Sequence, residues 1–137
     1  MAHHEWRPDW TLDRTCLYWY MTFDMDTALI ERAEQLGPAL TRLHWVNRVP
    51  TDWLHLTLQE VGYVDDVTPE EVSQIAEAAR QVQDLLPLNV ELGAVTTMTD
   101  AVVLPAVLSP ELVQAHALLA DSIGDRAHAR PDAEPFW

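Results

Sequence analysis

The chain has 137 residues, of which 48% are hydrophobic, so it is long enough for one domain with a real core and too short for two independent ones. Its 22 acidic side chains outnumber the 8 basic ones, all of them Arg, which gives a formal net charge of -14. This balance excludes a basic stripe that would grip a nucleic-acid backbone along its length.

The same composition predicts a cytoplasmic protein. A single Cys16 excludes an internal disulfide framework and fits a reducing compartment, and no Cys/His cluster indicates zinc. The first residues lack the basic start and apolar run of a signal peptide. No apolar run approaches the roughly 20 residues that span a bilayer, so we expect no contact with a membrane.

The first predicted element is a buried strand over residues 16–23 (CLYWYMTF), which are mostly aromatic and apolar. A helix begins near Thr27, because apolar residues recur after it at steps of four and three. Gly37 and Pro38 interrupt this pattern and predict either a kink or a stop followed by another helical turn. The apolar face of this helix consists of Leu29, Ala33, Leu36, Leu40 and Leu43.

Residues 44–49 are a candidate edge strand that leads into residues 51–60, TDWLHLTLQE. Apolar and polar side chains alternate in the second stretch, as in a strand with one buried face. Its leucines would face the core, while an imidazole, a hydroxyl and an amide would lie on the other face. The first set is Leu54, Leu56 and Leu58, and the second is His55, Thr57 and Gln59.

Two further helices are predicted from their capping residues. Residues 68–71 (TPEE) form a capping box with Pro at the first helical position, and Ser109 followed by Pro110 opens another helix, which Gly124 closes. Between these helices, residues 88–95 and 101–108 read as two strands joined by a Thr-rich turn. The apolar stripes are Val72, Ile75, Ala76, Ala79 and Val82 in the earlier helix, and Leu112, Val113, His116, Leu119 and Ile123 in the later one.

The order strand, helix, strand, helix, strand, strand, helix predicts an α+β domain whose helices cover one sheet face and leave the other open. His55 and Thr57 would stand on that open face. A weak internal repeat accompanies this order, since the strands at 16–23 and 101–108 are each followed by a helix of similar kind.

Residues 48–66, RVPTDWLHLTLQEVGYVDD, resemble the first signature of the 2H phosphoesterases, the superfamily of bacterial RNA 2',5'-ligases and 2',3'-cyclic nucleotide phosphodiesterases. Members carry two H-x-[ST]-x motifs, one in each of two pseudo-symmetric lobes of antiparallel sheet, on facing strands of a concave cleft with helices outside. His55 and Thr57 match the first motif, and no other His has Ser or Thr two positions later.

The resemblance implies a single domain over residues 1–137, with an N-terminal extension at 1–15, a first lobe at about 16–86 and an incomplete second lobe at about 87–137. In family members, a segment like AEPFW is followed within a residue or two by the second motif, whereas this sequence ends with it.

The resemblance also implies a metal-free hydrolase without a cofactor. Opening a 2',3'-cyclic phosphate is an in-line displacement in which one group deprotonates water and another protonates the departing ribose oxygen, and two imidazoles can do both. His55 would be one general acid or base, and Thr57 would donate to a phosphate oxygen. The substrate would be a small nucleotide or an RNA end with a 2',3'-cyclic phosphate or 2',5' linkage, met by a monomer or an edge-paired oligomer.

Two alternatives stay open at this point. Tyr18, Tyr20 and Gln59 are candidate substrate-binding residues, although packing is the simpler role for the two tyrosines. The whole chain is alternatively a catalytically silent 2H-fold module that binds a small ligand or a protein partner. His116 is expected to be a satisfied core histidine, and the acidic run at 65–71 is assigned to a loop and a helix N-terminus, with no metal.

Overall fold

The protein is an α+β domain whose helices and strands follow the predicted order. The computed structural model describes residues 11, 13–23, 25–44, 46–98 and 101–124. Within these residues, helices are interspersed with antiparallel strands that pair as three two-stranded ladders. The expected α+β class is therefore confirmed.

The longest ladder pairs β1 (Cys16–Thr22) with β2 (His55–Tyr63), and its register is irregular at two points. Adjacent β1 residues pair with β2 residues two apart at each point, which leaves Leu58 and Val61 as extra residues in β2. Such β-bulges interrupt the regular alternation of side chains between the two faces. The alternation predicted for this strand therefore holds only at its beginning.

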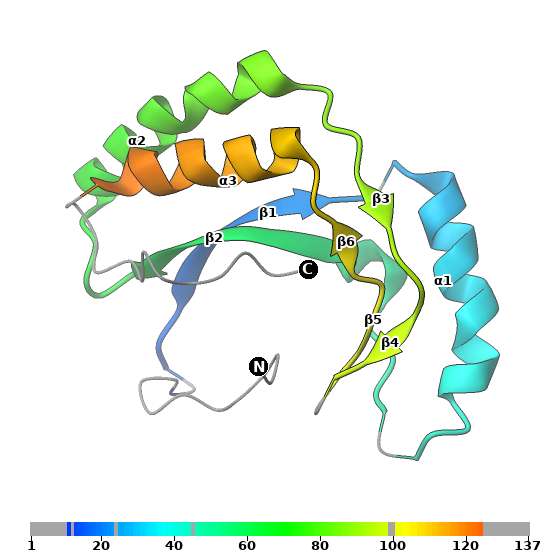
Figure 1. Ribbon diagram of the computed structural model, residues 1–137. Coiled ribbons are helices and arrows are strands. Elements are labelled where there is room, and N and C mark those ends of the chain that lie inside the picture. The colour runs from blue at the N-terminus through cyan, green and yellow to red at the C-terminus, as the bar shows by residue number, and fades with distance from the viewer. Residues whose placement is uncertain (1–10, 12, 24, 45, 99–100, 125–137) are drawn as a thin grey trace.

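Helices α2 (Pro69–Ala78) and α3 (Pro110–Ile123) lie side by side over one face of this ribbon, as Figure 1 shows. A 3-10 segment, η2 (Ala79–Leu85), continues α2. Ala79 and Val82, the last two residues of the apolar stripe predicted for a single helix, lie in this 3-10 segment. The core under these helices is a cluster of buried side chains with further apolar residues packed against it. The cluster consists of Val61, Val67, Ile75 and Ile123, with Leu17, Trp19 and Val72 around it.

The predicted capping residues begin both helices. The Thr68 hydroxyl accepts from the Glu71 N–H at 3.2 Å, and the Glu71 carboxylate accepts from the Thr68 N–H at 2.8 Å, so the capping box of α2 is confirmed. In α3, the Ser109 hydroxyl accepts from the Leu112 N–H at 3.1 Å, and Gly124 ends the helix with a φ of 54°.

One residue of the predicted core side of α3 is misplaced. Val113 is 49% exposed, whereas Ala115, which the pattern did not include, is fully buried. Neighbouring residues are about 100° apart around a helix, so Leu112 and Val113 cannot both face the centre of the core. The buried face of α3 consists of Leu112, Ala115, Leu119, Ser122 and Ile123.

Helix α1 (Thr27–Leu40) begins where the sequence predicted, because the Asp26 carboxylate accepts from the Leu29 N–H at 3.0 Å. It runs on through Gly37 and Pro38 instead of stopping there. In Figure 1, α1 stands apart from α2 and α3, at the other end of the molecule.

The edge strand predicted at residues 44–49 is wrong for the part of this segment that the structure describes. Val46 donates its N–H to the carbonyl of Leu43 at 2.9 Å, so the chain turns here and does not extend. The guanidinium of Arg48 also pairs with Glu34 of α1 at 2.6 Å, which holds the segment against that helix.

The two strands predicted between α2 and α3 form a hairpin, but each is broken into two short pieces. Strand β3 (Glu91–Leu92) pairs with β6 (Ala106–Val107), and β4 (Thr96–Thr97) pairs with β5 (Val102–Val103). Pro105 has no N–H for a ladder, and its carbonyl accepts from Gly93 at 2.7 Å between the two pieces. Thr96 and Thr97 belong to a strand and not to the predicted turn.

This hairpin supplies a second core at the start of β2. Leu56, Ala106 and Leu112 are buried together, and the apolar residues packed on them come from β1 and the residue after it, from β2 and from the first arm of the hairpin. Leu56 and Leu58 therefore face the core as predicted. The surrounding residues are Met21, Phe23, Leu58, Val90 and Leu92.

Most of the predicted N-terminal extension and the tail at 125–137 lie outside the described residues. Arg14, which is described, pairs with Asp66 at 2.8 Å and Asp65 at 3.4 Å, and its guanidinium carbon lies 3.8 Å from the centre of the Tyr63 ring. These contacts join the approach to β1 to the end of β2. No helix in the described part of the chain is long and apolar enough to pass through a membrane.

Candidate functional site

His55 is the first residue of β2 and lies on the surface of the ribbon. The short 3-10 segment η1 (Thr51–Trp53) ends two residues before it, and the Nδ1 atom of His55 lies 2.8 Å from the Trp53 carbonyl oxygen. A carbonyl oxygen can only accept, so Nδ1 carries the proton in the neutral ring and Nε2 has the free lone pair. Within the described residues, Nε2 makes no hydrogen bond, and the ring is exposed.

Leu56 fixes the face on which His55 lies. Because Leu56 is buried against α3 and the hairpin, the adjacent His55 must project from the opposite face of the ribbon. The expectation that His55 is exposed on the face away from α2 and α3 is therefore confirmed. Thr57 shares this face, since it is two residues along and precedes the first bulge, and it is half-buried.

Tyr20 of β1 lies against His55. The two ring centroids are 4.5 Å apart, with an angle of 65° between the ring planes, which is an edge-to-face contact. Tyr18 stacks on Tyr20 with centroids 5.5 Å apart and planes at 24°. Tyr20 pairs with Thr57 in the ladder, so the structure brings four of the five predicted site residues onto one face.

The electrostatic surroundings of Tyr20 keep its hydroxyl protonated. Partial burial raises the pKa of the Tyr20 phenol most, and the charges of Cys16 and Glu60 raise it further. Glu60 pairs with Tyr18 across the ladder and is buried, so a carboxyl group also belongs to this face. Strict alternation along the strand assigns Glu60 to the core face, so the sequence did not indicate it as part of the site.

Gln59 does not lie on this face, and its predicted placement is wrong. The extra residue Leu58 shifts the alternation, so Gln59 pairs with Trp19, which packs on the core under α2 and α3. Gln59 is only 3% exposed, and its amide donates to the carbonyl of Glu60 at 2.8 Å. A buried amide with an internal partner has no access to a ligand on the His55 face.

The other predicted polar residues do not join the site. The Nε2 atom of His116 is buried without a hydrogen-bond partner, so the expected satisfied core histidine is not what the structure shows. Desolvation lowers the pKa of His116. Asp65, Asp66 and Glu71 are engaged by Arg14 or the α2 cap, and the described residues contain no group of three side chains suited to a metal ion.

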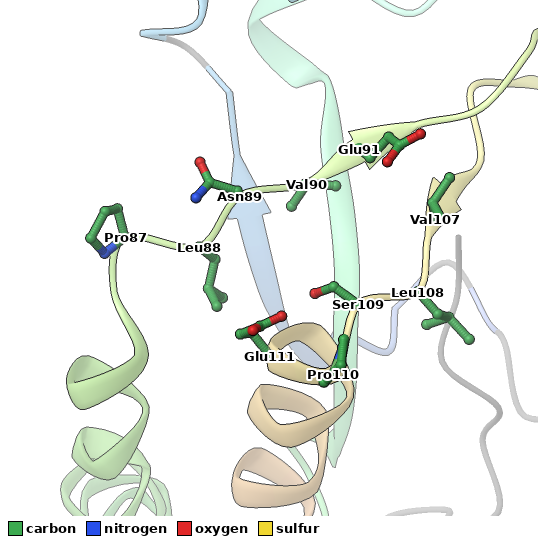
Figure 2. Close-up of a pocket in the computed structure, with 10 residues that line it drawn as sticks. All are labelled: Pro87, Leu88, Asn89, Val90, Glu91, Val107, Leu108, Ser109, Pro110 and Glu111. Carbon is green, nitrogen blue, oxygen red and sulfur yellow. The ribbon is translucent and has the colours of Figure 1, made fainter.

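A groove of about 640 Å³ lies elsewhere, between the segment before β3 and the start of α3. Figure 2 shows its two walls, residues 87–91 and residues 107–111, with β1 and β2 behind them. None of the five predicted site residues lines it. The hollow and the exposed imidazole are therefore separate features of the molecule.

No protein-family model, curated protein or solved structure matches the chain significantly. An exposed imidazole with a fixed tautomer, two hydroxyl side chains beside it and a shape open to solvent can exchange a proton with a bound group and donate hydrogen bonds to an anion.

Proposed function

We propose that the chain is a metal-free phosphodiesterase of the 2H type that acts on a 2',3'-cyclic phosphate or a 2',5'-linked end of RNA. The observation that carries this proposal is the state of His55, whose Nδ1 is held by the Trp53 carbonyl while Nε2 stays available on an exposed face. Thr57, on the same face, supports it as the hydroxyl of the H-x-T motif.

In the proposed reaction, a water oxygen attacks phosphorus while the bond from phosphorus to one ribose oxygen breaks. As a base, Nε2 of His55 would take the proton of the water while solvent water protonates the leaving ribose oxygen; as an acid, it would protonate that oxygen while solvent takes the proton of the attacking water. The Thr57 hydroxyl would donate to a non-bridging oxygen and stabilise the charge that develops there. The net charge of -14 favours a compact phosphodiester over a long nucleic acid.

A second candidate function rests on the number of motifs. His55 is the one His with Thr or Ser two positions later, and one such motif supplies one of the two proton transfers. In this alternative the chain is a silent member of the same fold, with two lobes around a cleft, and binds a nucleotide-like ligand or a protein partner through the His55 face.

The test measures both binding and turnover of a 2',3'-cyclic nucleotide, with a 2',5'-linked dinucleotide as a second substrate. We expect slow hydrolysis, because losing one positioned acid or base costs about 10²- to 10⁴-fold. His55→Ala should abolish what hydrolysis there is, and Thr57→Val should reduce it. His44→Ala is the matched control, since it removes an exposed His outside the site.

Each outcome separates the two functions. Turnover that depends on His55 and not on His44 supports the phosphodiesterase. Binding that depends on His55 without any turnover supports the silent module. Hydrolysis that survives His55→Ala at full rate, or the absence of both binding and turnover, contradicts the proposal.

A further inference from the structure

Among the residues that the structure describes, two contacts hold the imidazole of His55, a hydrogen bond and a ring contact. The bond from Nδ1 to the Trp53 carbonyl, at 2.8 Å, fixes one atom of the ring. A ring anchored at one atom of its edge can still tilt, and it can break that bond and flip. The edge-to-face contact with Tyr20, at 4.5 Å between centroids, limits both motions.

We propose that Tyr20 is a positioning residue for His55, holding the imidazole in the orientation and tautomer that leave Nε2 available beside Thr57. The kinetic part of this inference rests on the proposed function, whereas the orientation of the ring does not. Tyr20 is suited to the role by its place in the ladder, because its register partner is Thr57 and β2 carries His55 two residues earlier.

Packing alone does not account for Tyr20. The core side of β1 is formed by Leu17, Trp19 and Met21, which pack on the two buried clusters. Tyr20 is on the other face and remains 48% exposed, so it contributes little to either core. Within the described part of the chain, its ring contacts on that face are with Tyr18 and His55.

The chemistry of a phenol also fits a positioning role. Burial and nearby negative charge raise the pKa of Tyr20, so its ring stays neutral throughout the range in which an imidazole gains and loses a proton. The contact therefore does not switch off when His55 changes its charge. Tyr18, stacked on Tyr20 at 5.5 Å, limits the freedom of the Tyr20 ring in turn.

The experiment records ¹⁵N imidazole spectra of the full chain, which report the tautomer of each His. In the unchanged protein, we expect the Nδ1–H tautomer at His55 and nuclear Overhauser contacts between the Tyr20 and His55 rings. Tyr20→Phe keeps the ring and should keep both features of the imidazole. Tyr20→Leu should move the two nitrogen shifts toward the average of the two tautomers.

Tyr63→Leu is the matched control, because Tyr63 is at the far end of the same ribbon and pairs with Cys16. It should leave the His55 spectrum unchanged. If Tyr20→Leu leaves the spectrum unchanged, or Tyr63→Leu alters it equally, the inference is overturned. Absence of Tyr20–His55 contacts in the unchanged protein also overturns it, even where the Leu variant does not fold.

Kinetics then separate this inference from the proposed function. If hydrolysis occurs, Tyr20→Leu should lower kcat by about 10- to 100-fold through misplacement of Nε2, and Tyr20→Phe, which keeps the ring, should lower kcat less than Tyr20→Leu does. A full effect on the tautomer with no hydrolysis by any variant supports the positioning role and rejects the phosphodiesterase. Hydrolysis that needs His55 but is unaffected by Tyr20→Leu overturns the positioning role alone.

Discussion

Two adjacent residues, His55 and Leu56, should differ widely in how much stability is lost on truncation to Ala. Leu56 is 7% exposed and packs with Ala106 and Leu112, so Leu56→Ala removes buried surface and leaves a cavity. Truncations of this kind cost about 2–5 kcal/mol of the free energy of unfolding. His55→Ala removes an exposed hydrogen bond, whose carbonyl partner water can satisfy, and one ring contact, at a cost of about 1 kcal/mol or less.

The two variants are compared by thermal and urea unfolding at the same pH. For a chain of this length, 1 kcal/mol corresponds to roughly 4 °C in Tm, so the Leu56 variant should melt roughly 8–20 °C lower and the His55 variant at most roughly 4 °C lower. The slope of unfolding against urea should not change. A loss in His55→Ala equal to that in Leu56→Ala, or a Leu56→Ala variant as stable as the unchanged protein, would refute the assignment of faces.

Two further predictions concern stability and pH. Burial lowers the pKa of His116 from 6.5, so the stability that its neutral ring allows is present above pH 6.5 and is lost as the pH falls through the folded pKa. His116→Leu should therefore raise the urea midpoint more at pH 5.5 than at pH 7.5. Equal shifts of the midpoint at the two pH values would contradict this. Thr68→Ala should cost about 0.5–2 kcal/mol at pH 7 by removing the α2 N-cap. Hydrogen bonds from Thr68 lower the pKa of Glu71 from 4.5, so the part of the Thr68→Ala loss that involves Glu71 is present above pH 4.5 and disappears as the pH falls through the folded pKa. The difference in Tm between the unchanged protein and Thr68→Ala should therefore shrink in acid. A constant difference would argue against the reciprocal cap.

Helix boundaries in this protein were predictable because local chemistry sets them. Thr68 and Ser109 accept hydrogen bonds from N–H groups three residues ahead, and Gly124 adopts a positive φ at the end of α3. Each device acts within one turn of chain, so the residues alone identify it. The same holds for the start of β2, where His55 and Leu56 lie on opposite faces as alternation requires.

Long-range pairing decided what the sequence left undetermined. The bulge at Leu58 exists because β2 pairs with β1 in a shifted register, and no local signal near Gln59 marks it. That shift buries Gln59 and brings Glu60 to the face of Tyr18.

By itself, the sequence determined the α+β order, the capped helices and an H-x-T pair at the start of a strand with His55 exposed. The tertiary structure alone decided that Tyr20 contacts the His55 ring and that Trp53 sets its tautomer, because these contacts depend on where a neighbouring strand and a preceding turn place their atoms. Strand register is a property of two segments together, and hydrophobic alternation in one segment cannot specify it.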